Sequence, residues 1–87
     1  LKFSKQAYII SEHYREIAEA IMEQMGRGVT SIKARGMYSD QEKRMLFCVV
    51  SKKEIVRLKE IVAEFDSSAF VIVSDAREVF GEGFIEY

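Results

Sequence analysis

The chain has 87 residues, of which 48% are hydrophobic and 31% are charged, and its net charge is −1 at pH 7. This length suits a single domain, residues 1–87, because two domains of half the size could not each bury a stabilising core. The composition is that of a globular protein. A charge this small argues against nucleic-acid binding, and no window approaches the ~20 apolar residues of a membrane-spanning helix.

The N-terminal third is predicted to form a strand and then a helix. Residues from Ala7 to Ser11 are short, apolar and strand-favouring. From Tyr14 to Met25, apolar residues recur at spacings of three and four, with glutamates on the other side, which indicates an amphipathic helix. Ser11 is the expected N-cap, and Gly26 suits the left-handed position that ends such a helix.

The middle of the chain is typical of a hairpin. Residues 29–34 alternate between apolar and polar, which indicates a half-exposed edge strand. A turn around Gly36 and Asp40 follows, and residues 44–50 then form a continuously apolar strand of the buried, central kind. Cys48 is the only cysteine and lies in this apolar run, so we expect a buried, unreactive thiol and no internal disulfide.

A second helix and a last strand complete the predicted domain. Ser51 and Glu54 form a capping box, in which each side chain satisfies a free amide at the start of a helix. The apolar stripe of that helix ends at Phe65, and the apolar run from Ala69 to Ser74 is the fourth strand. The order of elements predicts an α+β, ferredoxin-like split βαβ sandwich. Its antiparallel sheet has the first and third strands at the centre and both helices on one face.

The segment after the fourth strand is predicted to be a single helical turn. Asp75 is placed to cap this turn and Gly81 to end it. Gly83 would then let the chain reverse, so that Phe84 and Ile85 return to apolar surface. The alternatives are that this C-terminal segment only ties the tail to the core, or that it also has a function.

One face of the predicted sheet lacks a cover. Two helices cover only one face, yet the first, third and fourth strands are apolar at successive positions. A large exposed apolar patch is unusual on a soluble monomer. We therefore expect the second face to pack against another copy of the domain, which makes a homo-oligomer, or against the tail at Phe84 and Ile85.

Catalysis and metal binding find little support in the sequence. His13 is the only histidine, stands among charged residues, and is predicted to be a solvated surface residue rather than a general base. With one histidine and one cysteine, neither a zinc site nor any other metal or cofactor is expected. The glycine-containing run at residues 26–30 lacks the ending of a phosphate loop and follows a helix instead of preceding one.

The hairpin turn carries the richest cluster of candidate binding residues. It combines cations, a hydroxyl, an aromatic ring and free backbone amides, a set that suits a small anionic or nucleotide-like ligand. The candidate residues are Arg35, Gly36, Tyr38, Ser39, Lys43 and Arg44. The alternative is an ordinary solvated hairpin. RNA binding through the sheet would need stacking aromatics beside a basic motif, and Phe47 alone supports it poorly.

Three segments together resemble a known family. They are GRGVT (26–30), RGMYSDQEKRMLFCVVSKKEIVRLKEIV (35–62) and AFVIVSDAREVFGEGF (69–84), and they are similar to the soluble C-terminal domain of the YitT family of bacterial multi-pass membrane proteins. The resemblance covers nearly the whole chain and implies a PII-like, ferredoxin-type module on the cytoplasmic face of the cell membrane, with no catalytic residues to transfer. Ser39-Asp40 departs from the Thr-Gly pair expected after the hairpin tyrosine.

The resemblance also implies a role. PII-like modules assemble through their sheets and bind small anionic ligands between subunits, so Gly81 and Gly83 from a neighbouring segment would join the hairpin residues in lining a cleft. The expected function is a non-catalytic regulatory or ligand-sensing domain. The alternative is a purely structural module for oligomerisation or protein docking.

Overall fold

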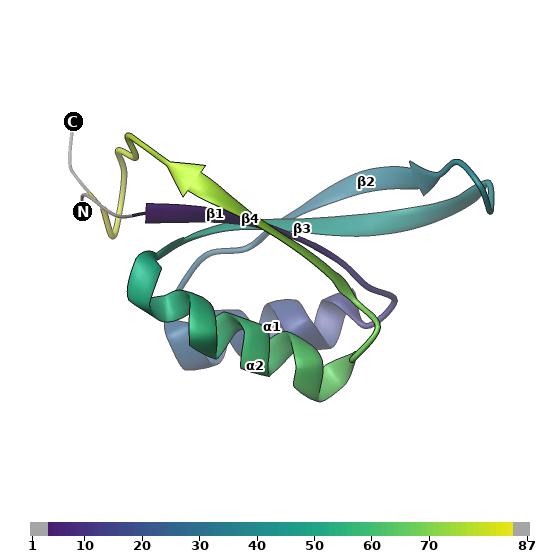
Figure 1. Cartoon of the computed structure of the whole chain (residues 1–87), viewed down its shortest axis with the longest axis horizontal. Helices are drawn as coiled ribbons and strands as arrows, with labels where there is room; N and C mark the ends of the chain where they lie inside the picture. Colours follow the sequence, from purple (N-terminus) through teal and green to yellow (C-terminus); the bar gives the residue numbers. More distant parts are fainter. Residues whose placement is uncertain (1–3, 85–87) are drawn as a thin grey trace.

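The computed structural model describes residues 4–84 and confirms the predicted architecture (Figure 1). Its elements are β1 (Ser4–Ile10), α1 (Tyr14–Met25), β2 (Thr30–Gly36), β3 (Gln41–Ser51), α2 (Ile55–Phe65) and β4 (Phe70–Ala76), and a short 3₁₀ turn (Lys52–Glu54) leads into α2. The four strands form one sheet in the order β2-β3-β1-β4, and every neighbouring pair is antiparallel. The edge position predicted for β2 and the central positions predicted for β1 and β3 are confirmed.

Both helices lie on the same face of the sheet, and the core fills the space between the two layers (Figure 1). Alternate residues of β1 and β3 point into this core, as the period of two of a strand requires. The fully or nearly fully buried apolar residues are Ala7, Ile9, Ile17, Ala20, Ile21, Leu46, Cys48, Val50, Leu58, Ile61 and Val62. The predicted burial of the lone cysteine is therefore confirmed.

The C-terminal cap of α1 is the predicted one, whereas the N-terminal cap is not. Gly26 has a φ of 66°, and its amide donates to the carbonyl of Met22 at 3.1 Å, which is the predicted left-handed C-cap. The N-cap is His13, so the prediction of Ser11 is wrong. The Ser11 hydroxyl accepts the His13 amide at 2.9 Å in a local turn before the helix and donates to Asp66 at 2.6 Å.

The helical turn predicted at Asp75 does not form. Strand β4 continues through Ala76, and Asp75 pairs across the sheet with Lys5, the two charged atoms being 2.5 Å apart. The pairing with β1 extends the strand past the point where the local capping signal would start a helix. Gly81 and Gly83 both have positive φ, 141° and 88°, and they turn the chain in an irregular segment.

The face of the sheet opposite the helices is apolar and only partly covered. We call it the open face; it carries Tyr8, Ile10, Ile32, Met45, Phe47, Val49, Phe70 and Ile72. No helix lies over it (Figure 1). Phe70 is 70% exposed, Ile72 51% and Ile32 36%. The segment from Val79 to Phe84, which we call the tail, approaches this face beside Phe47 and Val49. Ile85 lies outside the described residues. The part of this segment that the structure describes, up to Phe84, therefore leaves much of the open face uncovered.

Candidate functional site

The tip of the β2–β3 hairpin, residues 37–40, is held away from the rest of the molecule. Met37 is 88% exposed and Tyr38 is fully exposed. The turn closes through a hydrogen bond from the Asp40 amide to the Gly36 carbonyl at 2.7 Å. Asp40 has a φ of 57°, a left-handed conformation that glycine adopts most easily, so the glycine expected here from the family resemblance has a conformational reason.

Two cations of the hairpin, Arg35 and Lys33, pair with acidic neighbours in exposed positions. Arg35 donates from Nη1 to the Asp40 carbonyl at 2.8 Å and lies 3.5 Å from the carboxylate of the same residue. Lys33 lies 3.7 Å from Glu42. Exposed pairs of this kind contribute little stability, so an incoming anion could displace the carboxylates at small cost.

Gly36 allows the hairpin side chains to close over the backbone. A Cβ at this position would lie 2.9 Å from the side chains of Lys43 and Ser39. The ammonium-bearing chain and the hydroxyl therefore cross directly over the glycine. This part of the predicted cluster is brought together by the structure.

Lys43 and Arg44 also line a hollow at the base of the hairpin. We call it the loop hollow; its volume is about 720 Å³, and it lies between the β1–α1 loop, the start of β3 and the α2–β4 loop. His13, Asp66 and Phe70 line it as well. Hydrogen bonds from the Ser11 hydroxyl and the Ser68 amide lower the pKa of Asp66. The loop hollow thus presents charges of both signs.

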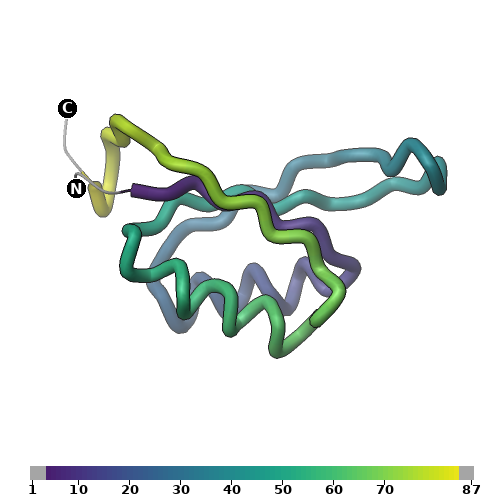
Figure 2. The backbone as a smooth tube through the Cα atoms, in the orientation of Figure 1, coloured from purple at the N-terminus to yellow at the C-terminus, as the bar shows by residue number. Residues whose placement is uncertain are grey.

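A second hollow lies at the other end of the sheet. We call it the tail hollow; its volume is about 570 Å³, and it is bordered by residues 26–30, residues 47–49 and the tail from Val79 to Phe84. Gly81 and Gly83 belong to it. The tube in Figure 2 shows the tail at one end of the molecule and the hairpin tip at the other, along a long axis of 40 Å. Within one chain, the two parts of the predicted cleft are therefore far apart.

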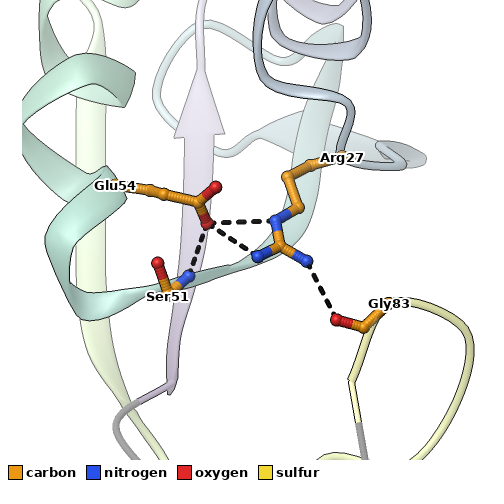
Figure 3. A network of polar contacts seen from close by, with 4 residues as sticks. All are labelled: Arg27, Ser51, Glu54 and Gly83. Carbon is orange, nitrogen blue, oxygen red and sulfur yellow. Dashed lines mark hydrogen bonds and ion pairs between the residues drawn. The ribbon is translucent and has the colours of Figure 1, made fainter. Parts of the chain in front are cut away.

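Arg27 lines the tail hollow and contacts two other segments beside it. Figure 3 shows its polar contacts with Glu54 and Gly83. Its Nε and Nη2 lie 3.0 Å and 2.9 Å from one carboxylate oxygen of Glu54, and Nη1 donates to the Gly83 carbonyl at 3.4 Å. The guanidinium also lies 4.5 Å from the centre of the Phe84 ring. Arg27 therefore joins the α1–β2 loop, the start of α2 and the tail.

Glu54 is the acceptor at the centre of this network. Its carboxylate accepts the Ser51 amide at 2.7 Å, in the capping box that the sequence predicted, as well as the two Arg27 nitrogens. Burial alone would raise the pKa of Glu54, but the hydrogen bonds from Ser51 and Arg27 outweigh it and hold the pKa below its usual value. The anionic form is thus favoured at neutral pH.

Sequence reasoning did not identify Arg27. Its partners are 27 and 56 residues away, so no local pattern connects them. The only sequence signal is an arginine placed between two glycines immediately after a helix end. That signal is compatible with an ordinary solvated loop.

The groups considered for catalysis and metal binding are dispersed. His13 is half exposed, and its Nδ1 lies 3.6 Å from Glu16. Burial raises the pKa of the Cys48 thiol to about 11. Among residues 4–84, no three or more histidine, cysteine, aspartate or glutamate side chains gather in a way that could hold a metal ion. In the same part of the chain, no helix is long and apolar enough to cross a membrane.

Solved structures with the same fold define the class of the protein. The crystal structure of a DUF2179 protein from Eubacterium ventriosum matches with a TM-score of 0.72 and 32% identity, over 82% of this chain and 97% of that one. Arabidopsis thaliana PII bound to citrate matches with a TM-score of 0.76 and 20% identity, over 99% and 92%. CPII from Thiomonas intermedia K12, bound to ADP, AMP and acetate, matches with a TM-score of 0.68 and 20% identity, over 88% of each chain. The fold is PII-like.

Residues 27–81 match the family described as "Uncharacterized protein conserved in bacteria (DUF2179)", and the chain belongs to this family. The UPF0750 membrane protein YvjA of Bacillus subtilis (strain 168) is 49% identical over 81 residues, which are 93% of this chain and 29% of the relative. The UPF0750 membrane protein YitT of the same organism is 35% identical over 75 residues, 86% and 27% respectively. The resemblance to YitT proteins is confirmed, and the chain spans less than a third of the length of these two relatives.

Proposed function

We propose that the chain is a non-catalytic regulatory domain that senses a small anionic ligand on the cytoplasmic side of a UPF0750-type membrane protein. Family membership and the PII-like fold support this role. The relatives are membrane proteins in which about 70% of the length lies outside the matched region, so the domain would be one part of a longer protein. The domain would pass the state of its ligand to that larger part.

The observation that carries the proposal is the exposed hairpin with its cations. Arg35 and Arg44 lie on one face of the two paired strands, Lys43 lies on the other face, and Tyr38 is fully exposed at the tip. Guanidinium and ammonium groups bind carboxylates and phosphates through charge-assisted hydrogen bonds. A hairpin that is anchored at its base and exposed at its tip can also change conformation when an anion binds.

Assembly would complete the cleft. In a single chain, the hairpin and the Gly81–Gly83 segment lie at opposite ends of the sheet (Figure 2). A second copy that packs on the open face could bring its own Gly81 and Gly83 next to the hairpin of the first copy. The apolar character of the open face supports such an interface, since exposed patches of this kind commonly mark interaction sites.

A thermal-shift experiment with citrate, ADP and AMP tests the ligand-sensing role; these probes match the ligands of the PII-like structures. A ligand at ten times its Kd stabilises the folded state by about 1.4 kcal/mol. For a domain of this size, that corresponds to a rise in Tm of about 5–10 °C. We expect Arg35→Ala to abolish the rise. Lys59→Ala, which removes a cation from the exposed surface of α2, should preserve it.

A purely structural oligomerisation module is the second candidate, and the exposure of Phe70 and Ile72 favours it. This function predicts assembly without any ligand and no effect of Arg35→Ala. Absence of stabilisation by all three probes at millimolar concentration, together with a stable oligomer, would replace the sensing proposal with this one.

A further inference from the structure

We propose that the outer surface of the helical layer is a second contact between copies of this chain, in which α1 of one copy packs against α2 of the other. This contact goes beyond the ligand-sensing role and depends neither on the hairpin nor on the open face. The helices lie on the opposite side of the sheet from the open face (Figure 1). Three features support the contact: the charges of the two helices, two exposed apolar side chains and the directions of the helices.

The two helices expose charges of opposite sign. Near its end, α1 carries the exposed carboxylates of Glu19 and Glu23. The 3₁₀ turn and α2 carry the exposed ammonium groups of Lys53 and Lys59. In the part of the chain that the structure describes, none of these side chains belongs to an ion pair. These charges are therefore available to an external partner.

Each helix also exposes a large apolar side chain beside its charges. Met22 on α1 is 45% exposed, and Val56 on α2 is 66% exposed. Met22 lies three residues after Glu19, and Val56 lies three residues before Lys59. Residues three or four apart are neighbours on the surface of a helix. Each helix thus presents an apolar side chain next to a charge, which is the combination of apolar centre and polar rim found in protein interfaces.

The two helices run antiparallel within one chain. Arg27, just after α1, pairs with Glu54, just before α2, at 2.9 Å. At the other end, Ser11 before α1 donates to Asp66 after α2 at 2.6 Å. A two-fold axis parallel to the helices preserves these directions. It therefore places α1 of one copy over α2 of the other in antiparallel orientation.

This orientation brings opposite charges together. When Met22 of one copy faces Val56 of the other, Glu19 lies three residues towards the start of α1, and Lys59 lies three residues towards the end of α2. In an antiparallel pair these two side chains face each other. A two-fold contact is self-complementary, so the same ion pair forms twice.

The self-complementary pattern favours a second copy over a different protein. Further along the same pair of helices, Arg15 lies seven residues before Met22, and Glu64 lies eight residues after Val56. These two exposed side chains also have opposite charges and would lie near each other in the same orientation. One sequence therefore supplies both halves of the contact along its length.

The contact is expected to be weak. Met22 and Val56 form a small apolar centre, and exposed ion pairs contribute little. We expect a dissociation constant of about 1 mM. At micromolar concentrations, association would therefore depend on the open face alone. The relatives are membrane proteins, and tethered modules meet at effective concentrations in the millimolar range, where this contact would form.

Mixing two charge-reversed chains tests the contact. Glu19→Lys alone, or Lys59→Glu alone, places like charges opposite each other twice, whereas the mixture restores two pairs of opposite charge. The labelled chain is ¹⁵N-labelled Glu19→Lys, and every chain also carries Ile72→Glu to remove association through the open face. We expect unlabelled Lys59→Glu at millimolar concentration to shift the amides of residues 14–25 and 55–65. Its dissociation constant should be at least about tenfold lower than that of unlabelled Glu19→Lys.

Lys33→Glu is the matched control, because it makes the same change in net charge on β2, outside the helices. We expect it to shift the amides of the labelled chain no more than unlabelled Glu19→Lys does. Salt at about 1 M, where the screening length is about 3 Å, should remove the advantage of Lys59→Glu.

Two results would overturn the proposal. If Lys33→Glu acts as Lys59→Glu does, attraction between net charges explains the binding and no specific contact exists. If Lys59→Glu leaves the amides of both helices unshifted at millimolar concentration, the helical layer is an ordinary solvated surface. The proposals about the hairpin and the open face would be unaffected by either result.

Discussion

At the residue scale, Glu54 determines how the tail and the start of α2 are held together. Its carboxylate accepts hydrogen bonds from Ser51 and Arg27, and Arg27 in turn contacts Gly83 and Phe84. The side chains of Arg27 and Glu54 are only 18% and 25% exposed. A partly buried, charge-assisted network contributes more than an exposed ion pair does.

Glu54→Gln is therefore expected to lower the free energy of unfolding by about 1–2 kcal/mol at pH 7. Because the pKa of Glu54 is lowered in the folded state, its contribution is complete above the unfolded-state pKa and is lost as pH falls through the folded-state value. Urea unfolding across this acidic range should show that the free energies of unfolding of the two proteins converge at low pH. A difference in free energy that stays constant with pH would contradict this role. Glu60→Gln, which changes an exposed pair with Arg57, is the control.

At the element scale, the two glycines that flank Arg27 are expected to respond differently to the same substitution. Gly26 closes α1 in a left-handed conformation, so Gly26→Ala should destabilise the protein by about 1 kcal/mol. Gly28→Ala, two residues later, should cause no loss, since its φ is not positive and an added Cβ meets nothing. Urea unfolding gives the free energy of unfolding of both variants. If both variants lost the same free energy, the left-handed cap conformation of Gly26 would not be the cause.

The helices and the sheet order followed from the sequence because their signals are local or periodic. The apolar spacing from Tyr14 to Met25 predicted α1 and its end at Gly26, although the helix begins after His13 and not after the predicted cap Ser11. The capping signal at Ser51 placed the start of the second helical region correctly. The segment after β4 was predicted wrongly, because the cross-strand pairing of Asp75 with Lys5 is a contact between residues 70 positions apart. Arg27 was missed for the same reason.

At the scale of the whole molecule, two regions of opposite character dominate the surface. The hairpin carries exposed cations, while the open face carries exposed apolar side chains, among them Ile32, Phe70 and Ile72. The sequence predicted the hairpin from its cations beside a turn. It predicted the open face because the apolar strands carry more apolar surface than two helices can cover. It could not predict how little of the open face the tail would cover, since that depends on where the irregular chain after Ala76 runs.

The proposed interface on the open face would make self-association sensitive to a charge introduced on that face and insensitive to a charge introduced on α2. Ile72→Glu places a carboxylate at a half-exposed position of β4 that a single folded chain tolerates. In the proposed assembly, the same carboxylate would be buried without a partner, which is strongly unfavourable. Val56→Glu is the matched control because Val56 is 66% exposed on α2, away from the sheet.

Sedimentation velocity at micromolar concentrations tests the central claim that the open face is covered by a second copy. We expect the unmodified chain and Val56→Glu to sediment as a species larger than the 10.0 kDa single chain, and Ile72→Glu to sediment at 10.0 kDa. A chain that remains at 10.0 kDa throughout the concentration range, with its apolar sheet face exposed to water, would contradict the account.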